Sequence, residues 1–225
     1  MDIKILLSNI AETTEAFDVS GMSLNTKTLT KGDLFIALQG EKNHGAEYIN
    51  SAIENGCIGV LIEGRDVDCG VPIIRIDNLK PHLSWLAQNF YTKAKDVDLI
   101  AVTGTNGKTS VSHYISQLLD FLEVNNGVIG TLGISKVEKK SINTTPDIFS
   151  IYSSLNEYSN QGIELAIIEA SSHALMQDRL EGLSFIQGIF TNLTQDHLDY
   201  HETMSNYKEA KGKLFTNGFS KKAII

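Results

Sequence analysis

The chain has 225 residues, of which 42% are hydrophobic and 20% are charged, so it can form one large globular domain or two ordinary ones. Its formal net charge of −8, with no block of Lys and Arg, argues against a nucleic-acid-binding surface. No apolar run approaches the ~20 residues of a membrane span, and the N-terminus does not resemble a signal peptide. Cys57 and Cys69 form no metal or redox motif, so we expect a cytoplasmic protein with reduced thiols.

The first part of the chain predicts short strands alternating with helices. We expect strands within 31–40, 58–62 and 71–76 and helices over 46–55 and 81–94. Gly56 stands where a helix commonly ends, which supports the first of these helices. The polar segment from Lys93 to Asp98 predicts a boundary, with one domain over 1–95 and a second over 96–225.

The second part also alternates strands and helices. We expect strands over 99–102, 127–130, 165–170 and 185–190, another beginning at 222, and helices over 111–122, 146–158 and 203–215. Thr145 is the predicted cap of the middle helix, with Pro146 in its first turn. This alternation predicts a parallel α/β sheet, whose ligands bind beyond the carboxyl ends of the strands.

The segment Asp98–Ser110 predicts a buried strand that leads into a phosphate-binding loop. Gly104 and Gly107 allow a tight turn, whose backbone N–H groups, together with those of Thr105, Asn106 and Ser110, can face phosphate oxygens. Lys108 supplies a positive charge, and the Thr109 hydroxyl can bind Mg²⁺. The general pattern has a further glycine at position 102, where this chain has Val102. We nevertheless expect this loop to bind a nucleotide.

Two further groups of polar residues follow predicted strands. Glu169 ends one strand, where its carboxylate can complete a magnesium site with Thr109 or serve as a helix cap. His197 and His201 have the spacing of a zinc pair on a helix, although a structural hydrogen bond is the simpler role for each. The H-E-x-x-H motif is excluded because its fifth position is Ser205.

Five motifs in this order resemble the Mur ligases. They are Gly104–Thr109, Asn143–Asp147, Glu169–Leu175, Asp196–His201 and Tyr207–Phe215. Within the family, the resemblance is to the members that extend UDP-N-acetylmuramoyl-L-alanyl-D-glutamate. It implies an N-terminal α/β domain that binds uridine, a central ATPase domain with a P-loop and a parallel sheet, and a C-terminal ligase domain. The chain matches the first domain and part of the second, so we expect a chain truncated at Ile225, without the third domain.

The resemblance also implies roles for single residues. Lys108 and Thr109 match the phosphate and magnesium positions, Glu169 matches a magnesium ligand, and His197 matches the ligand of a second magnesium ion. Lys211 matches a carbamylated lysine; the modification turns an ammonium, which repels Mg²⁺, into a carboxylate that can bind it. Without the modification, Lys211 would be expected to be a solvated helix residue. Lys108, His197 and Lys211 are thus the predicted catalytic residues.

Further matches concern the UDP-linked substrate. Thr144 and Thr145 match a hydroxyl pair at the substrate, and Ser171 and Arg179 match contacts to its peptide. An arginine suits this role because its planar guanidinium can pair with a carboxylate through two hydrogen bonds. In the first domain, Thr26 keeps the hydroxyl expected near the uracil. The neighbouring Asn25 and Lys27 replace the Asp and Arg that are usual in the family.

The implied reaction is an ATP- and Mg²⁺-dependent amide ligation in peptidoglycan synthesis. The γ-phosphoryl group of ATP activates the D-Glu carboxylate as an acyl phosphate, and the amine of L-lysine or meso-diaminopimelate then displaces phosphate. Three alternatives remain: an inactive fragment that only binds UDP-sugar or nucleotide, a related ligase such as a folylpolyglutamate synthetase, and a GTPase. The Asp196–His201 motif argues against the second, and the lack of an N-K-x-D motif argues against the third.

Overall fold

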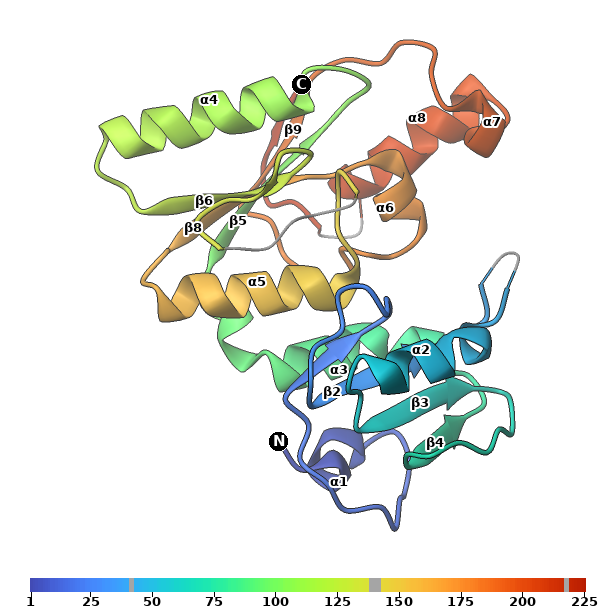
Figure 1. Ribbon diagram of the computed structural model, residues 1–225. Coiled ribbons are helices and arrows are strands. Elements are labelled where there is room, and N and C mark those ends of the chain that lie inside the picture. Colours follow the sequence, from blue (N-terminus) through green and yellow to red (C-terminus); the bar gives the residue numbers. More distant parts are fainter. Residues whose placement is uncertain (41–42, 138–142, 217–218) are drawn as a thin grey trace. The chain divides into compact units, whose positions relative to one another are not determined.

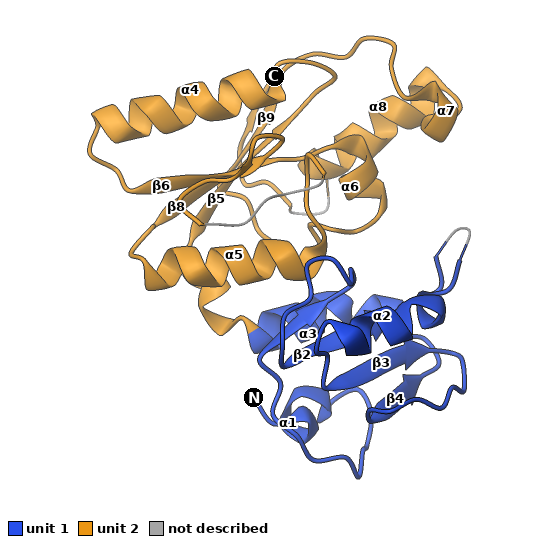
Figure 2. Cartoon of the chain, viewed as in Figure 1, with its two compact units in different colours: residues 1–90 blue, residues 91–225 orange. Residues whose placement is uncertain are grey.

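The computed structural model describes residues 1–40, 43–137, 143–216 and 219–225, and it divides into two compact units, Met1–Phe90 and Tyr91–Ile225 (Figures 1 and 2). The division falls earlier than the predicted boundary after residue 95. The reason is that the 3-10 helix η3 (Thr92–Asp96) is bonded to the second unit. The Lys93 main-chain N–H donates to Asn156 Oδ1 at 3.2 Å, and Lys93 Nζ donates to Asn160 Oδ1 at 2.7 Å.

The first unit contains a four-stranded parallel sheet with the order β1-β2-β3-β4. Its strands are β1 (Gly21–Ser23), β2 (Asp33–Ala37), β3 (Gly59–Glu63) and β4 (Ile73–Ile76). Its helices are α1 (Ile3–Leu7), η1 (Gly45–Tyr48), α2 (Ile49–Glu54), η2 (Lys80–His82) and α3 (Leu83–Phe90). The helix predicted over 46–55 is therefore divided into η1 and α2, and it is followed by Gly56 at a φ of +91°.

The core of the first unit lies on both faces of its sheet. Phe35 of β2 and Val60 of β3 belong to one buried cluster, together with Ile49 and other side chains of α2. Because successive strand residues point to opposite faces, the buried Leu34 and Ile36 face the other side. Burial on both faces explains why these strands read as nearly continuous apolar runs.

The second unit contains a six-stranded sheet with the order β10-β9-β5-β8-β6-β7. Its strands are β5 (Asp98–Thr103), β6 (Asn126–Gly130), β7 (Gly133–Ile134), β8 (Leu165–Glu169), β9 (Gln187–Phe190) and β10 (Ala223–Ile224). All neighbouring strands are parallel except β6 and β7, which form an antiparallel pair. The predicted parallel α/β fold is thus confirmed.

Helices cover both faces of this sheet. On one face, α4 (Lys108–Phe121) places Val111 and Ile115 against a cluster that includes Val102 of β5. The helix α5 (Ile148–Asn160) covers the opposite face (Figure 1). The chain then forms α6 (Ser172–Met176), α7 (Leu198–His201), α8 (Met204–Gly212) and η4 (Lys213–Phe215). Because α6 directly follows β8 and contacts α8, these helices lie at the carboxyl end of the sheet (Figure 1).

The start of α5 differs from the prediction. The cap is Asp147, whose side chain accepts a hydrogen bond from the Ser150 main-chain N–H at 3.1 Å. The prediction of Thr145 as the cap, with Pro146 in the first turn, is wrong. The Thr145 hydroxyl instead lies 2.6 Å from the main-chain oxygen of Glu169, so it joins the helix entry to the end of β8.

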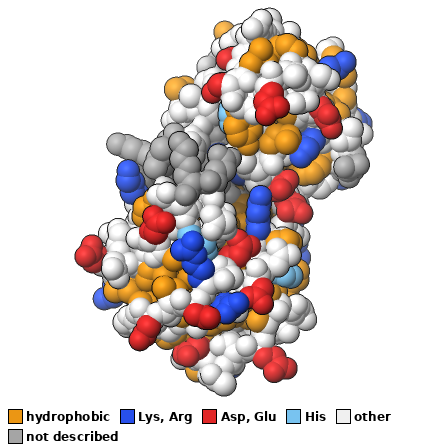
Figure 3. All heavy atoms as spheres, turned by 90° about the vertical axis from the view of Figure 1, so that its right-hand side faces the viewer, with side chains coloured by type: hydrophobic (Ala, Val, Ile, Leu, Met, Phe, Trp, Pro, Cys, Tyr) orange, Lys and Arg blue, Asp and Glu red, His pale blue; other side chains and the backbone are white. Residues whose placement is uncertain are grey.

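The described residues show how charge is distributed on one face and whether any helix could cross a membrane. Acidic and basic side chains are mixed on the face drawn in Figure 3, as expected for a chain without a long run of one charge. In the part of the chain that the structure describes, no helix combines the length and the apolarity that a membrane crossing requires.

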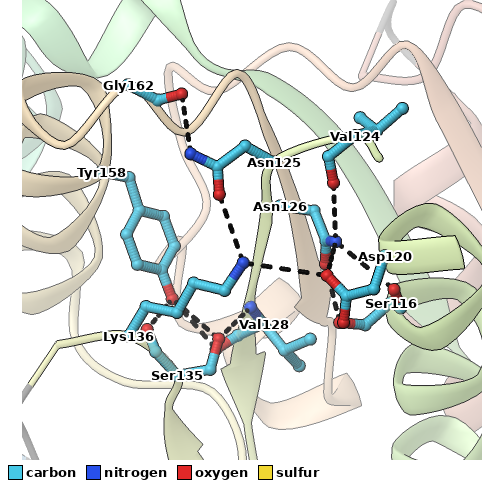
Figure 4. Close-up of polar contacts among 10 residues, drawn as sticks. All are labelled: Ser116, Asp120, Val124, Asn125, Asn126, Val128, Ser135, Lys136, Tyr158 and Gly162. Carbon is cyan, nitrogen blue, oxygen red and sulfur yellow. Dashed lines mark hydrogen bonds and ion pairs between the residues drawn. The ribbon is translucent and has the colours of Figure 1, made fainter. Parts of the chain in front are cut away.

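A buried polar network holds β6 to α4 (Figure 4). Asn126 at the start of β6 is fully buried, and its Nδ2 group lies within hydrogen-bond distance of the main-chain oxygens of Ser116 and Val124 and of Asp120 Oδ1. The Ser116 hydroxyl donates to Asn126 Oδ1 at 2.7 Å. Every polar atom of this buried amide is therefore satisfied, as a buried polar group requires.

Tyr158 of α5 anchors the β6–β7 pair from the other face of the sheet. Its hydroxyl donates to the main-chain oxygen of Ser135 at 2.7 Å, and burial raises its pKa to about 12. A Cβ atom at Gly127 would lie 2.5 Å from this ring, so only glycine fits there.

We expect Tyr158→Phe to lower the free energy of unfolding by about 1–2 kcal/mol, because it removes the hydroxyl that donates to the main-chain oxygen of Ser135. Urea unfolding measures this effect. The matched control is Tyr114→Phe on α4, because the Tyr114 side chain is 64% exposed and its change should alter stability by less than ~0.5 kcal/mol. Equal urea midpoints for the two variants would contradict the anchoring role.

Candidate phosphate and metal site

The loop between β5 and α4 has the backbone of a phosphate-binding turn. Gly107 precedes α4 at a φ of +84°, and Gly104 has a φ of +146°. A Cβ atom at Gly104 would lie 1.9 Å from the Thr191 hydroxyl oxygen, so no larger residue fits. Because α4 begins at Lys108, the N–H groups of its first turn, which includes Thr109 and Ser110, have no acceptor within the helix. Together with the helix dipole, these groups can bind an anion.

Two of the predicted phosphate residues direct their N–H groups elsewhere. The Thr105 N–H donates to the main-chain oxygen of Asn192, and the Asn106 N–H donates to Asn192 Oδ1, both at 3.0 Å. The Thr105 hydroxyl is buried and accepts hydrogen bonds from the Thr194 N–H at 3.0 Å and from the Tyr207 hydroxyl at 3.2 Å. In this geometry, Thr105 and Asn106 fix the shape of the loop.

Two lysines contact the same carbonyl group of this loop. Lys108 Nζ donates to the Gly104 oxygen at 3.0 Å, and Lys211 Nζ donates to it at 2.8 Å. Among the described residues, neither ammonium group forms an ion pair with a carboxylate. Two basic side chains therefore lie beside the loop, where they can contact an anion.

Lys211 is buried, with 1% of its surface exposed. Burial, with a further contribution from the charge of Lys108, lowers the pKa of Lys211 to about 7, although Asp196 acts in the opposite direction. Burial also lowers the pKa of Lys108. The expectation that an unmodified Lys211 is solvated is wrong, because α8 packs Tyr207 and this lysine against the loop, with Nζ 4.5 Å from the centre of the Tyr207 ring.

The carboxylate of Glu169, at the end of β8, is buried beside the phosphate loop. Its Oε2 atom accepts hydrogen bonds from the hydroxyls of Thr109 at 2.9 Å and Thr131 at 3.0 Å, and Oε1 accepts from the Thr131 N–H at 3.0 Å. Thr109 and Glu169 meet because β5 and β8 are adjacent. A carboxylate and a hydroxyl oxygen at this distance fit Mg²⁺, which prefers hard oxygen ligands.

The two histidines of the Asp196–His201 motif have different surroundings. The His201 ring is buried and lies 2.9 Å from the Ser172 hydroxyl through Nε2, which is a structural hydrogen bond. His197 has a left-handed backbone with a φ of 51°, and its ring packs edge-on against His173 at 4.9 Å between centroids. Among the described residues, no group of three His, Cys, Asp or Glu side chains could hold a metal ion, and no hydrogen bond joins His197 to Glu169.

The predicted substrate residues of the second unit gather around Thr145. Its hydroxyl accepts from the Ser171 N–H at 3.0 Å, and its main-chain oxygen accepts from Arg179 Nη1 at 2.7 Å. The hydroxyl of Thr144 lies 3.2 Å from that of Thr131, which also bonds to Glu169. A chain of direct contacts therefore connects these residues to the candidate magnesium ligand.

Thr26, the remaining predicted substrate residue, lies in the first unit in the loop after β1. Its main-chain oxygen accepts a hydrogen bond from Asn55 Nδ2 at 3.2 Å. The preceding Asn25 accepts from the Lys27 N–H at 3.0 Å through Oδ1. The unusual asparagine at position 25 therefore shapes this loop through its side chain.

Sequence reasoning missed four residues that support the site, namely Thr131, Gln177, Asn192 and Tyr207. Gln177 illustrates the group, because its Oε1 atom accepts from Arg179 Nε at 3.1 Å and so orients the guanidinium. Burial lowers the pKa of Arg179. Gln177 follows a recognised motif by two residues, and Tyr207 begins another. The partners of Thr131, Asn192 and Tyr207 are distant in sequence, so no local pattern indicated them.

Two family models and several curated proteins match this chain. Residues 102–225 match the model of the Mur ligase middle domain, and residues 18–91 match that of the Mur ligase family catalytic domain. A UDP-N-acetylmuramoyl-L-alanyl-D-glutamate--2,6-diaminopimelate ligase of Wigglesworthia glossinidia brevipalpis is 38% identical over 95% of this chain and 45% of its own length. The corresponding ligase of Alkaliphilus oremlandii is 37% identical over 88% of this chain and 41% of its own length.

Solved structures show the same similarity. The structure of a UDP-N-acetylmuramoyl-L-alanyl-D-glutamate--2,6-diaminopimelate ligase superposes with a TM-score of 0.77 at 28% identity, over 99% of this chain and 46% of that one. MurF ligase from Thermotoga maritima shares the fold, with a TM-score of 0.58 at 22% identity over 89% of this chain and 43% of its own. The chain thus spans about half the length of the relatives that it matches. With more than half of its residues matching the middle-domain model, this chain belongs to the Mur ligase family.

Proposed function

We propose that this chain forms the part of an ATP-dependent amide ligase that binds the UDP-linked substrate and the phosphates of ATP. Residues 1–95 would bind UDP-N-acetylmuramoyl-L-alanyl-D-glutamate through its uridine, and residues 96–225 would bind ATP. The observation that carries the proposal is the position of Lys108 and Lys211 on one carbonyl of a phosphate loop. On the same loop, Thr109 lies 2.9 Å from the buried carboxylate of Glu169.

Each group of the site then has a separate task. The free N–H groups at the start of α4 and the Lys108 ammonium would hold the phosphate oxygens of ATP. Thr109 and Glu169 would hold Mg²⁺, which neutralises phosphate charge while a carboxylate approaches. Arg179 and the hydroxyls of Thr144 and Ser171 would orient the peptide, so that the D-Glu carboxylate meets the γ-phosphoryl group and an acyl phosphate forms.

Lys211 supports the proposal in a second way. A pKa of about 7 leaves a large share of the amine unprotonated near neutral pH, and the unprotonated amine is the form that reacts with CO₂. Addition of CO₂ to the neutral amine would form an N–C bond and release a proton, and the resulting carbamate anion could bind the second Mg²⁺ together with His197. The burial of Lys211 would keep this adduct away from bulk water.

We further propose meso-diaminopimelate, rather than L-lysine, as the amino acid that is added. The support is that the curated relatives and the structure with a TM-score of 0.77 are named as 2,6-diaminopimelate ligases. A second candidate function is binding of the UDP-linked substrate or nucleotide without ligation. That alternative is supported by the phosphate loop and its two lysines, which can hold phosphate without any ligation step.

A ligation assay on this chain distinguishes these functions. The chain is supplied with UDP-N-acetylmuramoyl-L-alanyl-D-glutamate, ATP, Mg²⁺ and either meso-diaminopimelate or L-lysine, and tripeptide product is detected by mass spectrometry. Product with diaminopimelate supports the ligase, and product with lysine only would contradict the proposed amino acid. Binding of both substrates without product would support the second candidate, and binding of neither would contradict both.

A further inference from the structure

The segment that follows β9 is bonded to the phosphate loop along its length. We call this segment, Thr191–Thr194, the β9 extension. The Thr191 hydroxyl donates to the main-chain oxygen of Asn106 at 2.6 Å. Thr194 bonds to the Thr105 hydroxyl through its main-chain N–H and oxygen, at 3.0 Å and 3.1 Å. The extension therefore holds the loop from the side of the neighbouring strand.

Asn192 makes the most specific of these contacts. Its side-chain amide pairs with both main-chain groups of Asn106: the Asn106 N–H donates to Oδ1 at 3.0 Å, and Nδ2 donates to the Asn106 oxygen at 3.1 Å. Its own main-chain oxygen accepts from the Thr105 N–H at 3.0 Å. An asparagine amide has one acceptor and one donor at the separation needed to pair with a peptide in this way.

This pairing fixes the peptide groups that immediately precede Gly107. Gly107 has a left-handed backbone, and the residue after it begins α4 with its unpaired N–H groups. A loop that is already fixed before binding loses less conformational entropy when its ligand arrives. Contacts that hold Asn106 in place therefore favour phosphate binding without touching the phosphate.

We propose that Asn192 is a positioning residue that holds the phosphate loop in its binding conformation before the nucleotide arrives. The inference rests on the proposed function, because it assumes that this loop binds phosphate. Asn192 acts through the main chain of Asn106. The side chain of Thr194 provides a matched comparison, because Thr194 reaches the loop through its main chain and Thr194→Ala keeps those bonds.

The first test is calorimetric titration of the chain with Mg²⁺·ATP and with Mg²⁺·tripolyphosphate, which has no adenosine. We expect Asn192→Ala to raise the dissociation constant of both ligands about tenfold, the effect of losing two hydrogen bonds that hold the loop. Thr194→Ala should bind both within about twofold of the unchanged chain. Equal affinities for the two variants would overturn the positioning role, provided that the unchanged chain binds.

The second test is hydrogen exchange in the ligand-free chain, and it does not depend on phosphate binding. The Asn106 amide, which donates to the side-chain Oδ1 of Asn192, should exchange at least several-fold faster in Asn192→Ala than in Thr194→Ala. Unchanged exchange in Asn192→Ala would overturn the inference by itself. If the unchanged chain bound neither ligand, the proposed function would fail, and exchange would still decide whether Asn192 fixes the loop.

Discussion

Lys211→Met is expected to make the stability of this protein less dependent on pH. The pKa of Lys211 falls from 10.5 to about 7 in the folded chain, mainly through burial, so between these values the unfolded chain binds one more proton. The free energy of unfolding should therefore rise with pH through this window, by up to ~1.4 kcal/mol per pH unit from this one group. Methionine has no proton to exchange, so this contribution should disappear.

Urea unfolding at a series of pH values in CO₂-free buffer measures the effect of Lys211→Met. The difference in unfolding free energy between the unchanged chain and the variant isolates the contribution of Lys211 from those of other titrating groups. Lys208→Met is the matched control, because Lys208 is an exposed residue of the same helix and should leave the slope unchanged. Parallel stability curves for the unchanged chain and Lys211→Met would refute the lowered pKa.

Glu169→Gln is expected to abolish the dependence of ATP binding on Mg²⁺. The carboxylate accepts three hydrogen bonds from Thr109 and Thr131. In Glu169→Gln, the side-chain NH₂ group would face at least one of these donors, so that a hydrogen bond would be lost. The neutral amide is also a poorer ligand for Mg²⁺ than a carboxylate. We expect the affinity for Mg²⁺ to fall by about 100-fold, the upper end of the effects seen when metal sites are altered.

Titration of ATP in the presence and absence of Mg²⁺ measures this loss. Glu164→Gln is the control, because Glu164 immediately precedes β8, at the end of the strand opposite to Glu169, and is exposed. It removes the same charge and should leave the Mg²⁺ dependence intact. If Glu169→Gln and the unchanged chain respond equally to Mg²⁺, Glu169 is not a magnesium ligand.

The sequence predicted the longer strands, because local patterns determine them, but it did not predict the short strands β1 and β7. The parallel strands are buried on both faces, so β5 and β8 appear as apolar runs that end in polar residues. The same rule placed Thr109 and Glu169 at one edge of the sheet, where they lie 2.9 Å apart. Helix starts were less predictable. Threonine is a common capping residue, but the Thr145 hydroxyl donates to the main chain at the end of β8 and does not cap α5.

The supporting contacts of the site could not be predicted, because they join residues that are far apart in sequence. Asn192 pairs with Asn106 across 86 positions, and Lys211 contacts Gly104 across 107. Neither residue lies in a pattern that reveals its partner. The burial of Lys211 likewise results from the packing of α8 against the loop, whereas its sequence neighbours suggest a solvated helix face.

The most direct test of the central claim is a crystal structure of this chain with Mg²⁺ and a non-hydrolysable ATP analogue. We expect phosphate oxygens on the N–H groups at the start of α4, the Lys108 ammonium turned from the Gly104 carbonyl toward them, and Mg²⁺ bound by Thr109 and Glu169. An analogue bound elsewhere, or bound here with its Mg²⁺ away from both residues, would contradict the proposed ATP site.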